Sequence, residues 1–348
     1  MPPVLRRVLA GLAALGLVLV ALGCAPESLF PPTHQSTVYP ETDAARLILD
    51  VYRPITWIMV VIFVVVEGLL LYAAIRYRRK PGQQGNPRQI HGNTALEIGW
   101  TIIPVVIVIA IAFPTLRNLW ALAIPEDPNG EALHIKVVGK QWWWEFEYPE
   151  ELGVVTANEL HLPADRLVVL ELTSDNIIHS FWVPRLSGKR DLVPGRSQAI
   201  WFTTPSEPAM YYGQCAELCG PSHALMRFRV FVDGPEEFAA WAAKEAGPTV
   251  VPSTMESDGP AAMIAGGCVA CHKIDFEGSF FQSRLGPILT HVGSRSTIAG
   301  GILDNTPDNM AEWIRFPERL KPGALMPNND WLTDEQVDTI VAYLQSLE

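Results

Sequence analysis

Four side chains that bind soft metals fall within the twelve residues CAELCGPSHALM: Cys215, Cys219, His223 and Met226. In a helix all four would lie on one face and form an ordinary buried stripe, because they recur at helical spacing. The dipeptide Gly220-Pro221 argues against a helix, since proline removes a backbone donor and restricts the residue before it. The segment is therefore predicted to be a loop that gathers two thiols, an imidazole and a thioether.

Such a set of side chains is typical of a copper site. Thiolates and thioethers select copper, and imidazole also binds it. Structural zinc accepts two cysteines and two histidines but seldom a thioether. A disulfide between Cys215 and Cys219 would leave His223 and Met226 without a role. Copper therefore explains more of the pattern than either alternative.

A second group, CVACHK at residues 268–273, has the C-x-x-C-H pattern that attaches c-type haem. Cys268 and Cys271 would form the thioether bonds, and His272 would bind the iron from one side. A zinc site or a redox-active cysteine pair is the alternative. Covalent haem is favoured because the N-terminus predicts export.

The other axial iron ligand is expected downstream, where KPGALMP at residues 321–327 offers Met326. Met310 competes with it, but TPDNMAEWIRFPE begins an amphipathic helix, in which methionine usually fills the core. The closing LTDEQVDTIVAYLQSL has Thr333 as a cap and apolar residues at helical spacing. These segments predict an all-α haem domain over residues 261–348.

The elements before the haem motif are short strands. From Leu133 onwards, segments rich in Val, Ile, Phe and Trp are separated by Gly, Pro, Asn or Asp. They predict an all-β sandwich or barrel within residues 125–242, with the copper loop between two late strands. His179, expected at the end of an apolar strand in NIIHSFWVP, lies 36 residues before Cys215, and we expect it to reach the loop from a neighbouring strand.

The N-terminus has the pattern of an export signal. Residues 1–23 contain Arg6 and Arg7, then an apolar run that ends in small residues before Cys24. The ending ALGC resembles a bacterial lipobox, so we expect a lipoprotein signal peptide with Cys24 lipidated; an uncleaved anchor is the alternative. The other four of the five cysteines are assigned to copper and haem, so none is left for a disulfide.

Two apolar runs, at about 55–75 and 98–118, are each long enough to span a bilayer. Between them lies a basic loop with Arg76, Arg78, Arg79, Lys80 and Arg88. Short basic loops stay in the cytoplasm. Residues 24–120 are therefore expected to form an N-terminal segment and a transmembrane hairpin, with the later domains on the periplasmic side of a bacterial cell membrane.

Two acids, Glu67 and Glu97, lie in or at the edge of these spans, where a carboxylate is expensive and usually functional. Glu97 precedes the second span at its cytoplasmic end. The alternative for Glu97 is an interfacial acid that contacts the arginine cluster.

Composition agrees with this organisation. A hydrophobic fraction of 49% is high for a wholly soluble chain of 348 residues. The net charge of −11 leaves the exported domains acidic, so we expect no nucleic-acid partner. An acidic surface could steer a basic electron-donor protein, or it could simply be solvated. A segment rich in Pro, Gly, Ser and Thr is expected to be a linker, placed at residues 243–260.

Three segments carry a resemblance to a known family. GKQWWWEFEY, HSFWVPRLSGKRDLVPGR and YYGQCAELCGPSHALM follow a two-helix hairpin and resemble subunit II of the haem-copper cytochrome c oxidases, over about residues 40–240. The string C-x-E-x-C-x-x-x-H-x-x-M is highly specific. The resemblance implies a multidomain chain with a two-helix transmembrane hairpin and an all-β cupredoxin-like domain. The segments around RLGPILTHVGSR are similar to the all-α class I cytochrome c domains that are fused to subunit II in caa-type oxidases.

The resemblance also implies a binuclear copper centre, CuA. Its ligands would be two bridging thiolates, one imidazole for each copper, a weak thioether and a backbone carbonyl: Cys215, Cys219, His179, His223, Met226 and Glu217. Bridging thiolates let one electron be shared over both coppers, so little geometry changes when it arrives or leaves.

Two further implications concern the surroundings of this centre. The Glu217 side chain would help hold a magnesium ion at the interface with subunit I. Asn176 departs from the family, which often has an aspartate three residues before the histidine, so a hydrogen-bonding role is not carried over to this position.

The function implied is that of the subunit through which electrons enter a respiratory terminal oxidase. Electrons would pass from haem c to CuA and on to the haem-copper centre of subunit I, where oxygen is reduced to water and protons are pumped. The partners would be subunit I, other oxidase subunits and an external donor protein. A CuA-bearing nitric oxide reductase is the alternative. A quinol oxidase subunit lacks these copper ligands, and nitrous oxide reductase lacks the hairpin.

The resemblance gives roles to three more residues. Glu97 would stand at the entrance of a proton-conducting path into subunit I. Trp142 and Trp143 would lie between the copper surface and its partners as docking contact and electron conduit. Because side chains alternate along a strand, we expect that the three tryptophans of QWWW are not all in the core. Trp144 is expected to rest against the membrane interface.

Overall fold

The protein is described by a computed structural model that covers residues 33–79, 81–82, 85, 91–125, 127, 130–249, 258–275 and 281–348, with Gly11, Gln89 and Val251. Apart from Gly11, the predicted signal peptide and Cys24 lie outside the described residues. The chain forms two compact units. One unit holds residues 1–33 and 47–123, and the other holds residues 34–46 and 124–348.

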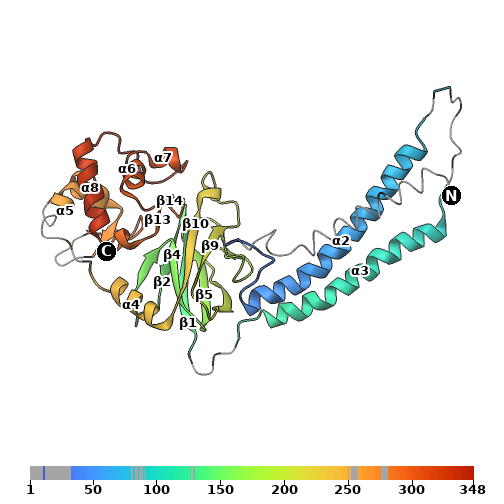
Figure 1. Ribbon diagram of the computed structural model, residues 1–348, viewed down its shortest axis with the longest axis horizontal. Coiled ribbons are helices and arrows are strands. Elements are labelled where there is room, and N and C mark those ends of the chain that lie inside the picture. Colours follow the sequence, from blue (N-terminus) through green and yellow to red (C-terminus); the bar gives the residue numbers. More distant parts are fainter. Residues whose placement is uncertain are drawn as a thin grey trace. The chain divides into compact units, whose positions relative to one another are not determined.

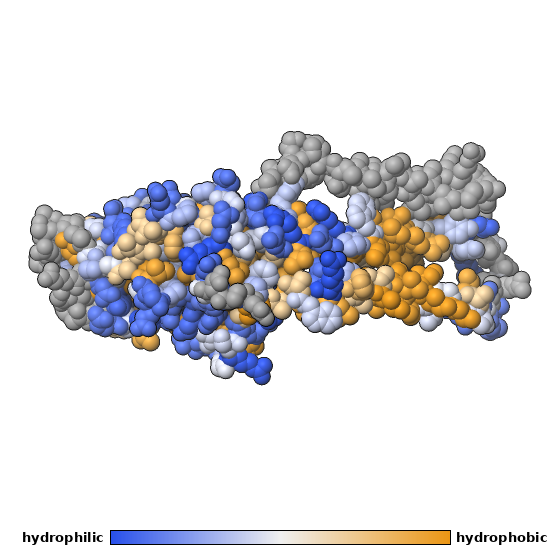
Figure 2. Space-filling view, turned by 90° about the horizontal axis from the view of Figure 1, so that it is seen from below, coloured by the Kyte–Doolittle hydropathy of each residue, from blue (hydrophilic) through white to orange (hydrophobic). Residues whose placement is uncertain are grey.

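Two long helices make up most of the first unit: α2 (Asp43–Arg76) and α3 (Thr94–Ala121). Both are long and apolar enough to cross a membrane. Figure 2 shows the hydrophobic residues gathered over these helices, where most large apolar side chains are exposed. The amide of Asn118 donates to the carbonyl of Leu47 at 2.5 Å, which ties the last turn of α3 to the second turn of α2.

Helix α2 begins well before the predicted span at residue 55. Its first turn is capped by Thr42, whose hydroxyl accepts a hydrogen bond from the amide of Ala45 at 3.1 Å. The helix continues through Pro54 into the apolar run. The apolar run therefore marks only part of the helix, because the polar first turns are stabilised by a cap that hydropathy does not register.

The second unit contains a β-sandwich of two five-stranded sheets (Figure 1). One sheet has the order β3-β2-β1-β5-β8 and contains β1 (Leu133–Lys140), β2 (Trp143–Glu147), β3 (Val155–Ala157), β5 (Leu167–Ser174) and β8 (Gln198–Thr203). The other has the order β4-β10-β9-β6-β7 and contains β4 (Glu159–Pro163), β6 (His179–Trp182), β7 (Arg190–Leu192), β9 (Ala209–Cys215) and β10 (Arg227–Asp233). The β1–β5 and β4–β10 pairs are parallel. The predicted all-β domain is confirmed.

All three tryptophans of QWWW are buried, at 7%, 8% and 0% exposure for Trp142, Trp143 and Trp144. The prediction that they are not all in the core is therefore wrong, and so is the placement of Trp144 at the membrane interface. Trp144 lies in the centre of the sandwich, with ring centroids 5.7 Å from Phe181 and 5.3 Å from Phe228. Because the chain reverses after Lys140, Trp142 belongs to a turn and strand alternation does not apply to it.

Helix α4 (Pro235–Ala246) follows the last strand and covers part of the sandwich. It buries Phe238 and Ala242, and the Trp241 ring stacks on His161 with centroids 4.3 Å apart. The helix therefore occupies the first positions of the predicted linker, because its apolar face has a surface to cover. Residues 252–257 of the linker lie outside the described part of the chain.

The C-terminal region is mainly helical, with short two-residue strand pairs. It contains α5 (Asp258–Ala265), η2 (Cys268–Ala270), β11 (Lys273–Ile274), β12 (Phe281–Gln282), η3 (Val292–Ser294), β13 (Thr297–Ile298), β14 (Leu303–Asp304), α6 (Pro307–Arg315), α7 (Pro317–Leu320) and α8 (Asp334–Ser346). Helices α5, α6 and α8 share a core that includes Met263, Met310 and Tyr343. Thr333 and Gln336 form a reciprocal cap at the start of α8, which confirms the predicted cap.

Candidate metal and haem sites

The loop 215–226 connects β9 to β10 at one end of the sandwich. Its two ends are joined by a hydrogen bond from the amide of Cys215 to the carbonyl of Met226 at 3.0 Å. Gly220 has a φ of +113°, a conformation that favours glycine, and a short helical turn, η1 (His223–Leu225), follows Pro221. The predicted loop is confirmed, and the backbone folds it back so that its polar side chains meet.

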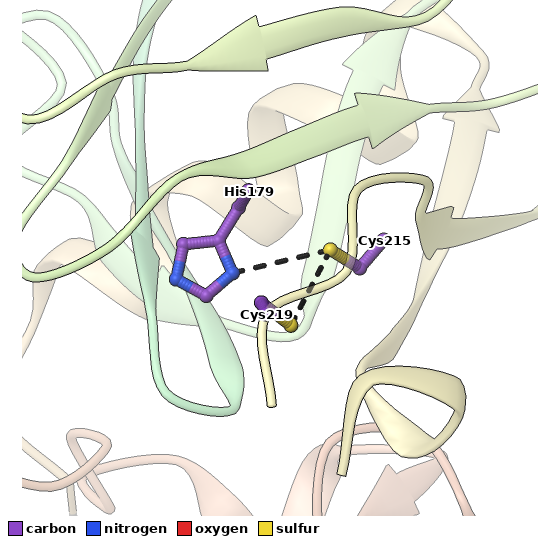
Figure 3. A group of neighbouring side chains, drawn as sticks. All are labelled: His179, Cys215 and Cys219. Carbon is purple, nitrogen blue, oxygen red and sulfur yellow. Dashed lines mark hydrogen bonds between the residues drawn. The ribbon is translucent and has the colours of Figure 1, made fainter. Parts of the chain in front are cut away.

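Three of the predicted copper ligands, His179, Cys215 and Cys219, are buried together (Figure 3). Their ligand atoms all lie within 4.8 Å of one another. The two sulfurs are 3.7 Å apart, and the Nδ1 atom of His179 is 3.9 Å from the sulfur of Cys215. In the described part of the chain this is the one group of three or more His, Cys, Asp or Glu side chains close enough to share a metal ion.

The other predicted ligands surround the same two sulfurs. The Nδ1 atom of His223 lies 3.6 Å from the sulfur of Cys219, and the sulfur of Met226 lies 4.0 Å from it. The backbone carbonyl of Glu217 lies 3.3 Å from the sulfur of Cys215. Each sulfur therefore has its own imidazole, and the remaining two donors lie one beside each sulfur. This donor set of thiolates, imidazoles and a thioether fits copper better than zinc.

The two cysteines differ in acidity. A hydrogen bond from Cys219 lowers the pKa of Cys215, and contact with His179 adds to this effect. The same contact with Cys215, together with burial, raises the pKa of Cys219. One thiolate therefore forms readily in the pair, and the second proton is displaced when a metal binds.

His179 begins β6, and the prediction that it ends a strand is wrong. The preceding turn is formed by Ser174, whose hydroxyl donates to the carbonyl of Ile177. This turn brings Asn176 back towards the histidine, where its Oδ1 atom accepts a hydrogen bond from Nε2 of His179 at 3.1 Å. Asn176 thus retains a hydrogen-bonding role despite the departure from aspartate, and it leaves Nδ1 of His179 free to face the sulfurs.

Glu217 presents its backbone to the cluster and its side chain to solvent. The side chain is exposed and belongs to no metal-binding group among the described residues. A magnesium site at this carboxylate would therefore need ligands from outside the described residues.

The C-x-x-C-H motif forms a tight turn at η2. The amides of Cys271 and His272 both donate to the carbonyl of Cys268 at 3.1 Å. Nδ1 of His272 donates to the carbonyl of Pro287 at 2.7 Å, which leaves Nε2 available for a metal. Gly286 lies against this ring, because a Cβ atom there would be 2.7 Å from Cε1 of His272. Burial lowers the pKa of His272, so the ring is held neutral as an iron ligand requires.

The two candidate axial methionines differ in their surroundings. Met310 is buried in α6, and its sulfur accepts from Nε2 of Gln345 at 3.7 Å. Met326 is half-buried in the irregular turn after α7 and packs against the edge of the same core. Met310 therefore already serves the core, whereas Met326 stays the predicted iron ligand.

Trp142 lies between the copper loop and the C-terminal region. Its Nε1 atom donates to the carbonyl of Cys219 at 2.8 Å, and Nε2 of Gln141 donates to the same oxygen at 2.9 Å. The sequence analysis did not identify Gln141 as a contact of the copper loop. Its position beside three tryptophans was only a weak indication of such a role. Trp143 instead packs under Lys140, whose ammonium lies 4.9 Å from the ring centroid.

Glu97 lies in the first turn of α3, where it forms a cap. Its Oε1 atom accepts from the amide of Asn93 at 3.2 Å, while the Asn93 side chain accepts from the amides of Ala95 and Leu96. Its predicted role in a proton path stays a prediction.

Comparisons with known proteins agree with this geometry. The family described as "Cytochrome C oxidase subunit II, transmembrane domain" matches residues 43–118, "Cytochrome C oxidase subunit II, periplasmic domain" matches 152–232, and "Cytochrome c" matches 257–348. Cytochrome c oxidase subunit 2 of Alkalihalophilus pseudofirmus is 36% identical over 337 residues and covers 95% of each chain. The Bacillus subtilis protein of the same name is 33% identical over 331 residues, which is 90% of this chain and 92% of that one.

Among solved structures, the periplasmic domain of subunit II of cytochrome oxidase from Bradyrhizobium japonicum is 31% identical, with a TM-score of 0.33. It covers 35% of this chain and 96% of its own. The two domain types imply a copper centre and a haem c. The chain therefore belongs to the cytochrome c oxidase subunit 2 family, as a membrane-anchored subunit of a haem-copper oxidase that carries its own cytochrome c domain.

Proposed function

We propose that this subunit receives electrons at its cytochrome c domain and passes them through its copper loop to subunit I, where oxygen is reduced to water and protons are pumped. One observation carries the proposal: two buried sulfurs lie 3.7 Å apart and each has an imidazole beside it. Copper held by these side chains would supply one-electron transfer there. The function of the surrounding residues is to keep that geometry constant.

The copper loop and the first residue of β6, His179, together hold the six proposed donors with little freedom to move. We assign the metal to His179, Cys215, Glu217, Cys219, His223 and Met226. Burial of both cysteines excludes water, and the Cys215–Met226 backbone hydrogen bond closes the loop. Asn176 fixes the orientation of the His179 ring. A rigid donor set of this kind requires little reorganisation when an electron arrives.

In the cytochrome c domain, Cys268 and Cys271 would hold the haem covalently, and His272 and Met326 would bind its iron. The Pro287 carbonyl orients the His272 ring and so sets which nitrogen faces the iron. Between the two centres we assign Trp142 as the conduit, because its indole contacts the carbonyl of the copper ligand Cys219 directly. Trp143 is only 8% exposed and lies under Lys140, so its proposed part in docking would be to support the surface that meets the partners.

Three parts of the proposal concern the membrane side and the partners. Glu97 would admit protons to a path in subunit I, and the Glu217 carboxylate would share a magnesium ion with that subunit. The copper and haem domains would face the periplasm and receive electrons from an external donor protein. Oxygen is the proposed acceptor, and oxygen uptake by the purified complex, compared with nitric oxide consumption, tests that assignment.

We also propose the domain boundaries. A lipoprotein signal peptide would occupy residues 1–23, with lipid on Cys24, and the N-terminal segment with its hairpin would occupy 24–120. The copper domain would occupy 125–242 and the linker 243–260. The cytochrome c domain would then comprise residues 261–348. Mass spectrometry of the mature N-terminus tests the lipid.

The copper assignment is tested by His223→Ala in the full chain, with His134→Ala as the matched control. His134 lies on β1 of the same domain and is exposed, paired with Glu171 at 3.5 Å. We expect His223→Ala to lose or alter the near-infrared absorption and electron paramagnetic resonance of the copper pair, while haem absorption is retained. An unaltered copper spectrum in His223→Ala would contradict the proposed ligand set.

The conduit is tested by Trp142→Ala, with the exposed Trp331→Ala of the cytochrome c domain as control. Time-resolved absorbance after flash reduction of the haem should show slower electron transfer from haem to copper in Trp142→Ala but not in Trp331→Ala. Both centres should keep their spectra and potentials. If the transfer rate is unchanged, Trp142 serves packing only.

A further inference from the structure

Lys321, the first residue of the turn that carries Met326, is buried with only 4% of its surface exposed. Its ammonium group donates to the carbonyl of Trp142 at 2.5 Å and to the carbonyl of Ala299 at 2.9 Å. Among the described residues, no carboxylate lies within ion-pair distance of it. The closer of its two acceptors, the carbonyl of Trp142, belongs to the copper domain and lies 179 residues away in the sequence.

The turn that begins at Lys321 also contacts the Trp142 ring. Gly323, with a φ of +81°, lies so close that a Cβ atom there would be 2.9 Å from Cη2 of Trp142. On the other side, a Cβ atom at Gly220 would be 3.0 Å from Cζ2 of the same ring. The indole is therefore enclosed between the copper loop and the turn of the cytochrome c domain.

A second contact joins the same turn to the copper loop. The hydroxyl of Ser222, which is fully buried, donates to the carbonyl of Pro322 at 2.6 Å. The turn of the cytochrome c domain is thus attached to the copper domain at two places. The Lys321 ammonium bonds to Trp142, and the Pro322 carbonyl bonds to Ser222. Only the Lys321 contact acts on the Trp142 backbone.

Burying a lysine without a carboxylate partner is unfavourable, because the ammonium loses its hydration. An apolar side chain of similar length would fill the same space at lower cost. The lysine is therefore explained by its directional donation to two carbonyls, which an apolar residue does not provide. Gly300 adjoins the ammonium, since a Cβ atom there would lie 2.3 Å from Nζ, so the absence of a side chain at this position lets the ammonium approach the backbone.

We propose that Lys321 is a positioning residue for electron transfer between the two domains. Its ammonium holds the Trp142 carbonyl and so keeps the indole against both the Cys219 carbonyl and Gly323. The inference rests on the proposed role of Trp142 as conduit, and it adds that the cytochrome c domain itself supplies the group that holds that conduit in place.

The positioning role is tested first by amide hydrogen exchange in the full chain. Lys321→Met keeps the stem and removes the ammonium, and Lys244→Met is the matched control. Lys244 also donates to the cytochrome c domain, to Ser294 at 3.0 Å, but its side chain is exposed at the end of α4 and does not bond to Trp142. In Lys321→Met, the amides of Ala324 and His223 should exchange roughly tenfold faster, the equivalent of one hydrogen bond to a charged group. Unchanged exchange would overturn the positioning role.

The second measurement is haem-to-copper transfer after flash reduction of the haem. Lys321→Met should slow this step roughly tenfold while both centres keep their spectra and potentials. Lys321→Arg, which retains the positive charge and N–H donors, should recover part of the rate. If Lys321→Met fails to retain haem or copper, Lys321→Gln takes its place, because the glutamine side chain is too short to reach the Trp142 carbonyl. The same slowing of haem-to-copper transfer is then expected.

The outcomes separate the inference from the proposed function. If Trp142→Ala slows transfer and the Lys321 variants do not, the conduit holds and the positioning role is wrong. If Trp142→Ala leaves transfer unchanged, the conduit is wrong, and hydrogen exchange alone then decides whether Lys321 holds the turn.

Discussion

Glu159 joins the copper domain to the cytochrome c domain through a single buried carboxylate oxygen. Its Oε1 atom accepts from the amide and hydroxyl of Ser296, at 2.9 and 2.6 Å, and from the amide of Thr297 at 3.1 Å. The Glu159 side chain belongs to β4, and both donors belong to the other domain. Replacing it with Gln keeps the size and one acceptor but removes the charge.

The expected loss follows from the kind of hydrogen bond. Bonds to charged groups contribute about 1.5–3 kcal/mol and neutral ones about 0.5–1.5 kcal/mol. Because these three bonds and a longer fourth one, from the hydroxyl of Thr297 at 3.4 Å, share one oxygen, their energies do not add, and we expect Glu159→Gln to cost about 2 kcal/mol. The cost should fall on the attachment of the cytochrome c domain, because both donors lie there.

Guanidinium denaturation of the purified full chain in detergent measures this loss. Haem absorbance reports the cytochrome c domain, and tryptophan fluorescence reports mainly the sandwich. Glu159→Gln should lower the haem transition and separate it from the fluorescence transition, whereas the exposed Glu207→Gln should change neither. The reasoning is refuted if both transitions of Glu159→Gln coincide with those of the wild type.

Three other predictions concern the assigned ligands and the membrane helix. Met326→Ala should shift the Soret band and lower the haem potential in a redox titration, and Met310→Ala should do neither. The opposite result would assign the axial iron ligand to Met310 instead. Asn176→Ala should weaken copper binding roughly tenfold or more in a chelator competition, because the His179 ring loses its orientation, and unaltered affinity would exclude that role. Glu97→Ala should slow oxygen turnover without altering copper or haem spectra; turnover at the wild-type rate would leave Glu97 as a helix cap.

The sequence by itself determined those features that depend on neighbouring residues. Gly220-Pro221 excluded a helix through the copper ligands because proline acts on its own backbone and on the residue before it. Thr333 identified the start of α8 because a cap bonds within its own turn. Apolar runs located the membrane helices, although the start of α2 escaped them because it depends on the Thr42 cap. The haem motif likewise lies within five consecutive residues.

The tertiary structure decided every feature that depends on residues distant in the chain. Trp144 is central because two strands of the opposite sheet, β6 and β10, supply its aromatic neighbours Phe181 and Phe228, and alternation along one strand did not reveal that. His179 faces the cysteines because the turn at Ser174 brings Asn176 onto its outer nitrogen. Nothing near Lys321 in the sequence distinguishes it from a solvated lysine. Its role follows from a carbonyl 179 residues away, because folding alone removes its ammonium from water and presents it with that acceptor.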